Sequence, residues 1–277
     1  MVSPRALLAA CLLAGGLGVP ALAEAPGRVV SINLCTDQLA MMLAAPGQLV
    51  SVTEFATDPS ASVMAEAAKA YQSNGGRAEE VYLLHPDLVL AGQYTARVTV
   101  SMLRRLGVPV VEFGPGESLD DVRANILRMG EVLGRESAAL ALAQRFDSAL
   151  AALEPPPGQR PTAATYAVNG YTTGDRSLSG AIIARAGFDN LAQRFGLPYG
   201  GILPLEALVM SDPDLVISGQ DYPGPARAEE VLHHPAFLAL EGDHAVMQDR
   251  DWVCGLPSVV GAIERLTAQR HAIEAKP

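Results

Sequence analysis

The chain contains 277 residues, of which 30 are acidic and 20 are Lys or Arg, so its formal net charge at pH 7 is -10. Because no basic stretch is present to neutralise phosphates, we expect no nucleic-acid partner. The three cysteines are too few for a fold built on disulfides, although an oxidising compartment would allow one bridge. The length is sufficient for two α/β domains of about 100–150 residues each.

The first 23 residues have the pattern of an export signal. Arg5 precedes an apolar run at 6–14, which two glycines interrupt, and Ala21-Leu22-Ala23 ends the segment. This pattern predicts cleavage after Ala23, and the apolar run is shorter than the ~20 residues that a membrane-spanning helix needs. A lipoprotein cleavage site at Cys11 ranks second, because it would leave almost no apolar core in the signal.

Beyond this signal, short apolar runs alternate with amphipathic stretches, which is typical of parallel βαβ units. The predicted strands are 28–33, 48–53, 87–91, 108–113, 162–168, 214–218 and 245–248. The predicted helices of the two halves are 36–44, 78–84, 95–106, 178–186, 205–210, 228–240 and 259–275. We therefore expect an α/β fold of two lobes, each a layered parallel sheet, at residues 24–117 and 155–277.

Residues 118–154 are predicted to connect the two lobes. Apolar side chains recur at helical spacing through 120–153, and a proline run at 155–157 closes the segment. We interpret this segment as one helix of about 34 residues, roughly 50 Å long at a rise of 1.5 Å per residue. Such a helix would hold the lobes with little relative motion. The alternative is two helices broken at Gly134.

A repeated segment occurs once in each lobe. Residues 79–93 (EEVYLLHPDLVLAGQ) match residues 206–220 (EALVMSDPDLVISGQ) at a constant offset, since 206 − 79 and 220 − 93 both equal 127. In each copy a helix is predicted to end before Pro86 or Pro213, and a buried strand follows. The repeat indicates that the two lobes share one structural unit.

The predicted strands also indicate where a ligand would bind. In parallel α/β sheets, helix N-termini and the carboxyl ends of the strands share one edge, and ligands bind at that edge. The candidate ligand-binding residues are Asn33, Cys35, Thr36, Phe55, Gln93 and Tyr94 in the first lobe, and Asn169, Tyr171, Tyr222 and Trp252 in the second. Their aromatic and amide groups favour a large, flat or polycyclic ligand with a hydrogen-bonding periphery. Loops are, however, rich in Tyr and Asn for other reasons too.

Glu79 and Glu206 occupy the same position of the repeat, in the first turn of a predicted helix at the same edge. In one interpretation each acid only complements its helix dipole, by ~0.3–1 kcal/mol. In the other, one carboxylate on each lobe flanks the cleft and meets a basic residue of a partner, where bidentate pairing with arginine would provide specificity. These residues alone leave both interpretations open.

Taken in order, these features resemble the periplasmic binding proteins that serve ABC importers of ferric siderophores, haem and cobalamin. The matching segments are 28–33, the repeat and its copy, 103–111, the connector with Gly134-Arg135, and 252–258. The resemblance covers essentially the whole mature chain. It implies a monomer in the periplasm, with two Rossmann-like lobes joined by one rigid helix around a ligand cleft. It also implies that Glu79 and Glu206 form salt bridges to arginines of a membrane permease.

The resemblance further implies that the ligand is a metal chelate, delivered to the permease of an ABC importer. We expect no resident cofactor and no metal site, because none of the five histidines of the chain falls among the candidate loops. A phenolate of Tyr94, Tyr171 or Tyr222 could still serve as an axial ligand to haem. Only Arg97 and Arg176 lie near the loops, so we expect a corrinoid or a hydroxamate siderophore rather than an anionic catecholate.

The two cysteines of the mature chain, Cys35 and Cys254, both fall on the predicted cleft edge. They could form a bridge across the lobes, place a thiolate against the ligand, or be two buried, unpaired apolar residues. The sequence has no Gly-x-Ser-x-Gly, no phosphate-binding loop, no His-Glu-x-x-His and no Cys-x-x-Cys, so we expect no enzyme. An enzyme using Cys35 and a ligand sensor docking on a signalling receptor are the alternatives.

Overall fold

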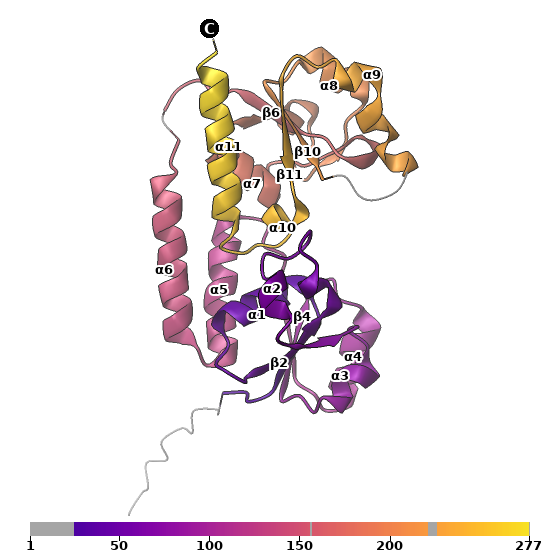
Figure 1. Cartoon of the computed structure of the whole chain (residues 1–277), viewed down its shortest axis with the longest axis vertical. Helices are drawn as coiled ribbons and strands as arrows, with labels where there is room; N and C mark the ends of the chain where they lie inside the picture. Colours follow the sequence, from indigo (N-terminus) through magenta and orange to yellow (C-terminus); the bar gives the residue numbers. More distant parts are fainter. Residues whose placement is uncertain (1–24, 156, 221–225, 277) are drawn as a thin grey trace, which may run out of the picture.

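The structure is a computed structural model that describes residues 25–155, 157–220 and 226–276. The predicted signal segment, with its cleavage site after Ala23, lies outside these residues. Figure 1 shows two lobes along the long axis of the molecule, with long helices running along one side of both. The predicted α/β fold with two lobes is confirmed.

The N-terminal lobe is built on a five-stranded parallel sheet with strand order β3-β2-β1-β4-β5. Its elements, in chain order, are β1 (Val29–Ser31), α1 (Leu34–Leu43), β2 (Leu49–Thr53), the 3₁₀ helix η1 (Glu54–Thr57), α2 (Ala65–Ala68), β3 (Gln72–Asn74), α3 (Ala78–Leu83), β4 (Leu88–Gly92), α4 (Arg97–Arg105) and β5 (Val110–Phe113). The chain then leaves the lobe through α5 (Leu119–Leu133) and α6 (Glu136–Ala152).

The C-terminal lobe has a four-stranded parallel sheet with order β11-β10-β6-β8, and a separate antiparallel pair, β7 with β9. Its elements are β6 (Thr162–Thr165), η2 (Val168–Gly170), β7 (Tyr171–Thr172), α7 (Leu178–Arg185), β8 (Asp189–Asn190), η3 (Leu191–Phe195), β9 (Gly201–Ile202), α8 (Leu205–Ser211), β10 (Leu215–Gly219), η4 (Arg227–His233), α9 (Pro235–Leu238), β11 (Asp243–Met247), α10 (Asp249–Trp252) and α11 (Val259–Glu274). In reverse, the order β8-β6-β10-β11 corresponds to β2-β1-β4-β5, so the lobes share one topology.

The central strands are buried on both faces. In β4, Leu88 and Leu90 pack into one hydrophobic cluster, while Val89 and Ala91 pack into another on the opposite face. This is why these strands are continuous apolar runs in the sequence rather than alternating ones. The first cluster continues through α5 and α6 into the second lobe, where it includes Ile182 of α7. The two lobes therefore share one continuous core.

The connection between the lobes is two helices, so the prediction of a single helix over 120–153 was wrong. α5 ends at Leu133 and α6 begins at Glu136. Gly134 lies between them with φ 65 and ψ 37, in the left-handed region that commonly ends helices and that glycine adopts without a steric penalty. The chain therefore reverses at this glycine instead of continuing along one axis.

The two connecting helices lie side by side, as Figure 1 shows. A Cβ at Gly130 of α5 would collide with the Cβ of Ala139 of α6, so the missing side chain permits the close approach of the helices. Arg123 Nε donates to Asp147 Oδ2 across the pair at 2.9 Å. The connector is thus a short, packed helical hairpin rather than a long rod.

The repeat corresponds to α3-β4 in one lobe and α8-β10 in the other, and both helices end in the same way. His85 and Asp212 each adopt a left-handed backbone, with φ 48 and φ 42, directly before a proline. They are equivalent, since 212 − 85 equals 127. A residue before proline is disfavoured in the helical region, so the sequence stops both helices at this position.

The aspartate after each of these prolines joins two strands. Asp87 Oδ2 accepts hydrogen bonds from the backbone N–H groups of Gly27 (3.0 Å) and Arg28 (2.9 Å), just before β1. Asp214 Oδ2 accepts hydrogen bonds from the N–H (2.6 Å) and the hydroxyl (2.9 Å) of Thr162, at the start of β6. The Pro-Asp pair common to both copies thus anchors the first strand of each lobe beside its central strand.

The chain returns to the N-terminal lobe near its end. The backbone N–H of Arg250 in α10 donates to the carbonyl oxygen of Ser60 (3.2 Å), and its guanidinium donates to that of Pro59 (3.0 Å). The segment after α10 therefore lies against the first lobe before α11 packs back on α7 and α6. In the part of the chain that the structure describes, no helix is both long and apolar enough to span a membrane.

Candidate ligand-binding site

A cavity of about 210 Å³ opens at the carboxyl ends of β1, β4 and β5. This is the sheet edge where the sequence predicts ligand binding. The cavity is lined by Asn33, Cys35, Thr36, Leu39, Gly92, Gln93, Tyr94, Phe113, Gly114, Pro115, Gly116, Asn125, Val253 and Gly255. Five predicted residues therefore come together in its wall: Asn33, Cys35, Thr36, Gln93 and Tyr94.

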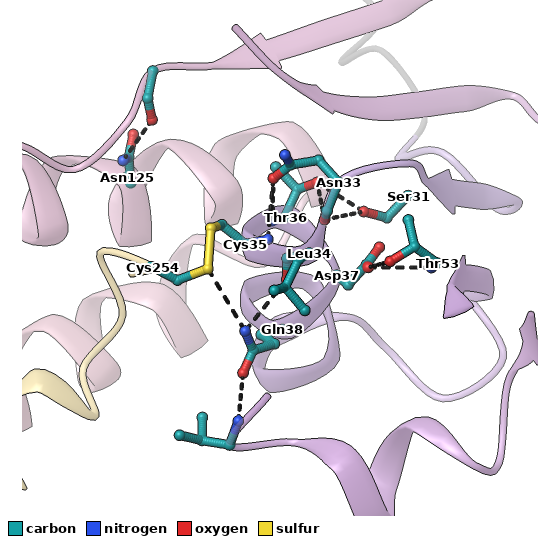
Figure 2. Close-up of a disulfide and its surroundings, with 12 residues drawn as sticks. Ser31, Asn33, Leu34, Cys35, Thr36, Asp37, Gln38, Thr53, Asn125 and Cys254 are labelled. Carbon is teal, nitrogen blue, oxygen red and sulfur yellow. Dashed lines mark hydrogen bonds between the residues drawn. A yellow bond between two sulfur atoms is a disulfide. The ribbon is translucent and has the colours of Figure 1, made fainter. Parts of the chain in front are cut away.

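The first turn of α1 forms one wall of this cavity (Figure 2). Asn33 Oδ1 accepts hydrogen bonds from the N–H groups of Cys35 (3.0 Å) and Thr36 (3.3 Å), which caps the helix. The Thr36 hydroxyl shares a hydrogen bond with that of Ser31 (2.8 Å) and donates to the Asn33 carbonyl oxygen (3.0 Å). The wall is held by its own hydrogen bonds before any ligand arrives. Asn33 Nδ2, which donates to no described residue, is the group that this side chain can offer a ligand.

Asp37, the next residue of α1, connects the helix to β2 by hydrogen bonds. Its Oδ2 accepts hydrogen bonds from the N–H (3.1 Å) and the hydroxyl (2.5 Å) of Thr53. Its Oδ1 is buried without a hydrogen-bond partner among the described residues. Burial raises the pKa of this carboxyl from 3.8 to about 6, because the charged form loses its water, although the nearby Ser31 hydroxyl and the hydrogen bonds from Thr53 oppose the shift.

The loop after β5 forms the opposite wall, and none of the residues predicted from the sequence lies in this loop. Asn125 Nδ2 of α5 donates to the Gly114 carbonyl oxygen at 3.3 Å and so holds the loop. A Cβ at Gly116 would lie 3.0 Å from the Cα of Gly255, so the two backbones touch where the second lobe covers the cavity. The same edge rule applied to the predicted strand 108–113 would have selected Gly114-Pro115-Gly116.

A disulfide joins the two lobes at the cavity. Cys35 in α1 and Cys254 after α10 are bonded, with a Cα–Cα distance of 5.2 Å (Figure 2). Gln38 Nε2 lies 3.7 Å from the Cys254 sulfur, and Gln38 Oε1 accepts a hydrogen bond from the Val63 N–H at 2.8 Å. Of the three possibilities for the cysteines, the bridge is the one present. Cys35 is therefore neither an unpaired residue nor a free thiolate in this state.

Two predicted residues, Phe55 and Trp252, lie outside the cavity wall. Phe55 follows β2 in η1 and is 62% exposed. Trp252 ends α10, half-buried, and packs against the hydrophobic core. The tryptophan is nevertheless adjacent in sequence to Val253, which lines the cavity.

Asn169 and Tyr171 of the second lobe do not line the cavity either. Asn169 in η2 and Tyr171 in β7 follow the carboxyl end of β6, and Tyr171 is 42% exposed. Tyr222 lies outside the described residues. Contact of a ligand with these three residues stays a prediction.

The two glutamates of the repeat are exposed in the first turns of α3 and α8. Neither Glu79 nor Glu206 forms a salt bridge or hydrogen bond with another described side chain. Both carboxylates are thus free to meet a partner, and their role in docking stays a prediction.

Comparison with known sequences identifies relatives of the chain. A family model described as periplasmic binding protein matches residues 29–242. The cobalamin-binding protein of Halobacterium salinarum is 31% identical over 199 residues, which make up 70% of this chain and 54% of that protein. The chain thus spans about half the length of this relative. The vitamin B12-binding protein of Yersinia pestis is 23% identical over 221 residues, 78% of this chain and 76% of that protein.

Solved structures share the fold. The periplasmic haem-binding protein of Roseiflexus sp. RS-1 has a TM-score of 0.71 at 21% identity and covers 89% of this chain and 98% of its own. A periplasmic haem-binding protein from Pseudomonas aeruginosa has a TM-score of 0.69 at 24% identity, over 91% of this chain and 95% of its own. At these identities the likeness shows a common architecture.

Removing the disulfide tests its contribution to the structure. The bond closes a loop with a sequence separation of 219, so replacing Cys35 and Cys254 by Ser is expected to lower the free energy of unfolding by about 2–5 kcal/mol. The measurement is guanidinium unfolding of the oxidised protein, the reduced protein and the double variant. The reduced protein should match the variant. Equal stability of all three forms would show that the bond does not form in solution.

The burial of Asp37 predicts a pH dependence of stability. Its folded pKa is raised, so folding favours the protonated acid, and this stabilisation is complete below pH 4 and is lost as the pH rises through 6. Between pH 7 and pH 4, wild type should gain about 2 kcal/mol of unfolding free energy relative to Asp37→Asn. Urea unfolding at several pH values measures the difference, with Glu264→Gln on the exposed surface of α11 as control. A pH-independent difference for Asp37→Asn contradicts the raised pKa.

Proposed function

The chain belongs to the periplasmic binding protein family, and from this premise we propose that it captures a metal chelate and delivers it to the permease of an ABC importer. The chelate would occupy the cavity at the carboxyl ends of β1, β4 and β5. The names of the relatives support this class of ligand, since they include cobalamin-binding and vitamin B12-binding proteins. We take a corrinoid as the first candidate and a ferric hydroxamate siderophore as the second.

The observation that carries the proposal is the uncharged lining of the cavity. Its polar side chains are those of Asn33, Thr36, Gln93, Tyr94 and Asn125, and the rest are apolar residues, glycines and the disulfide. Amide and hydroxyl groups can exchange hydrogen bonds with the amide periphery of a corrinoid, while apolar surface covers its ring system. An anionic catecholate would instead need cationic partners.

The positions of the two arginines expected near the cleft also favour a corrinoid over an anionic catecholate. Neither Arg97 nor Arg176 lines the cavity. Arg176 Nη1 donates to the Tyr199 hydroxyl at 3.0 Å, and its guanidinium lies 5.4 Å from the centre of the Tyr199 ring. This arginine is therefore held on the surface of the second lobe by an aromatic neighbour and is not directed at the cavity.

The size of the cavity supports a ligand that extends beyond it. At about 210 Å³ it is smaller than the ~300–1,000 Å³ of a typical enclosed ligand site. A corrinoid would fill this space with one edge and continue between the lobes. There Phe55, Asn169, Tyr171 and Tyr222 would contact the remainder.

Haem is a third candidate ligand, because one observation favours it. Tyr94 lines the cavity and is 80% exposed, so its phenol is accessible to a metal. The solved haem-binding proteins with this fold make haem a necessary member of any ligand panel. Coordination by Tyr94 would leave the same cavity in use but would require the phenolate form.

We further propose export to the periplasm with cleavage after Ala23, a monomeric state, and binding without catalysis. The disulfide supports an oxidising compartment. It also leaves no free thiol at Cys35, on which the alternative of an enzyme using Cys35 depends, because Cys35 is bonded to Cys254. Glu79 and Glu206 would contact the permease.

Calorimetric titration of the mature protein tests the ligand assignment. The panel is cyanocobalamin, haem, a ferric hydroxamate and a ferric catecholate. We expect cyanocobalamin to bind with a Kd below ~1 µM, equivalent to about −8 kcal/mol, and the catecholate not to bind. Loss of one hydrogen bond in Gln93→Ala should weaken binding about five- to tenfold.

The matched control is Gln144→Ala on the exposed face of α6, which should bind like wild type. Preferential binding of the anionic catecholate would contradict the corrinoid assignment. Equal binding by Gln93→Ala and wild type would show that the ligand does not use this cavity.

A further inference from the structure

The two ends of the disulfide lie in different surroundings. Figure 2 shows the bond between the first turn of α1 and the segment after α10. Cys35 is partly exposed and lines the cavity, whereas Cys254 is only 3% exposed. The Cys35 end of the bond is therefore the end that meets the cavity.

The bond also determines the position of a cavity wall. Val253 and Gly255 precede and follow Cys254 in the chain, and both line the cavity. Bonding of Cys254 to α1 therefore holds both of these wall residues against the first lobe. Without the bond, weaker contacts would hold the segment, such as the hydrogen bond from Arg250 to the Pro59 carbonyl oxygen. The shape of the cavity thus depends on whether the bond is formed.

A buried amide lies beside the other end of the bond. The side chain of Gln38 is fully buried, and its Nε2 lies 3.7 Å from the Cys254 sulfur and 3.4 Å from the Leu34 carbonyl oxygen. This N–H group can donate to a thiolate at Cys254, and hydrogen bonds to ionised acceptors are stronger than those to neutral ones. Gln38 is therefore placed to stabilise Cys254 when it leaves the bond as a thiolate.

Cys35 also occupies a favourable position for a thiolate. It lies in the first turn of α1, which runs from Leu34 to Leu43. The positive end of a helix dipole stabilises an anion in the first turn and makes a cysteine there a better leaving group. Both sulfurs of the bond are thus placed where the reduced form is stabilised.

Most structural disulfides resist reduction, and those that react are commonly exposed or strained. The Cys35–Cys254 bond is mostly buried, and its open end meets the cavity that a ligand is proposed to fill. A bond in this position is accessible when the cavity is empty and covered when the cavity is occupied. Its reactivity therefore depends on the ligand.

We propose that the bound ligand and the Cys35–Cys254 bond control each other. A small dithiol reduces the bond through the empty cavity, the ligand blocks this route, and the reduced protein binds the ligand more weakly. This inference rests on the proposed function and adds a redox control to its site.

The reduction consists of two exchange steps. A thiolate of the dithiol attacks the Cys35 sulfur, forms a mixed disulfide, and releases Cys254 as a thiolate. The second thiol of the dithiol then attacks its own sulfur in the mixed disulfide and releases Cys35. The dithiol becomes a disulfide, and the two electrons and two protons that it loses end on Cys35 and Cys254.

Thermodynamic linkage fixes the relation between the two effects. If loss of the bond weakens ligand binding by a given factor, the ligand must favour the bonded form by the same factor. A tenfold effect corresponds to about 30 mV for a two-electron couple. The two effects can be measured independently, and they must agree.

The first test measures reduction of the mature protein with and without saturating cyanocobalamin. The reductant is dithiothreitol, mixed with its oxidised form for the equilibrium measurement. Free thiols are trapped with iodoacetamide and counted by mass spectrometry. We expect cyanocobalamin to slow the reduction at least tenfold and to shift the equilibrium at least tenfold toward the bonded form. A chelate that calorimetry shows not to bind is the control and should change neither.

The second test measures cyanocobalamin binding without the bond. The protein with Cys35→Ser and Cys254→Ser should bind at least tenfold more weakly than the oxidised wild type, by calorimetry. Wild type kept reduced in dithiothreitol should bind like this variant. Circular dichroism of both forms checks that they are folded at the temperature of the titration.

The third test examines the route to the bond without a ligand. Val253→Phe adds an aromatic ring to the cavity wall at a position that is 57% exposed. We expect this variant to be reduced at least tenfold more slowly than wild type. No ligand is present, so stabilisation by binding does not contribute. The matched control is Leu238→Phe, which is 65% exposed on α9 outside the cavity and should be reduced like wild type.

Three outcomes contradict the inference. If bound cyanocobalamin leaves the rate of reduction unchanged, the bond is not reached through the cavity, and the proposed function stands. If the double Ser variant binds cyanocobalamin as tightly as wild type, the bond does not control affinity. If no chelate of the panel binds, the proposed function fails, and Val253→Phe decides the route by itself, since an unchanged rate of reduction overturns it.

Discussion

The covalent bond between Cys35 and Cys254 is the constraint on which the candidate site depends. It joins the first turn of α1 to the segment after α10, so residues far apart in the chain form one cavity wall. Without it, Val253 and Gly255 would be held against the first lobe mainly by the hydrogen bonds of Arg250 and by the contact between two glycine backbones. The bond and the α5-α6 hairpin connect the lobes at two separate places, and a core that runs through both lobes joins them further. We therefore expect little relative motion of the two lobes around the cavity.

The repeat imposes a second constraint, because it gives both lobes the same strand order and the same Pro-Asp anchor for the first strand. Because the unit is duplicated, equivalent positions have the same environment in both lobes. An exposed position is exposed in each copy, and a buried position is buried in each copy. The same repeat that places Val81 and Leu208 inward places Glu79 and Glu206 on the exposed side. In the proposed function, ligand capture would use the carboxyl ends of the strands, and partner docking would use the outer faces of two short helices.

Much of this architecture could be predicted from the sequence, because long apolar runs and the repeat determine the central strands and their flanking helices. The course of the connector could not be predicted from the sequence. It depends on a left-handed backbone at Gly134 and on close helix packing at Gly130, and a periodic apolar pattern indicates neither of these. β3 is short and polar (Gln72–Asn74) and lacks any strand periodicity. The predicted helix at 228–240 is divided at His234, because Pro235 disfavours a helical residue before it. The sequence could not predict whether Cys35 and Cys254 form a disulfide. Pairing depends on the distance between their Cα atoms, which their spacing in the sequence does not determine.

The central claim is that the cavity between the α1 turn, the loop after β5 and the segment around Val253 is where the chain holds its chelate. A crystal structure of the mature protein with cyanocobalamin tests this claim most directly. The account predicts the edge of the corrin ring in that cavity, in contact with Gln93 and Tyr94, with the Cys35–Cys254 bond intact. A corrinoid bound elsewhere on the protein, with this cavity filled only by water, would contradict it.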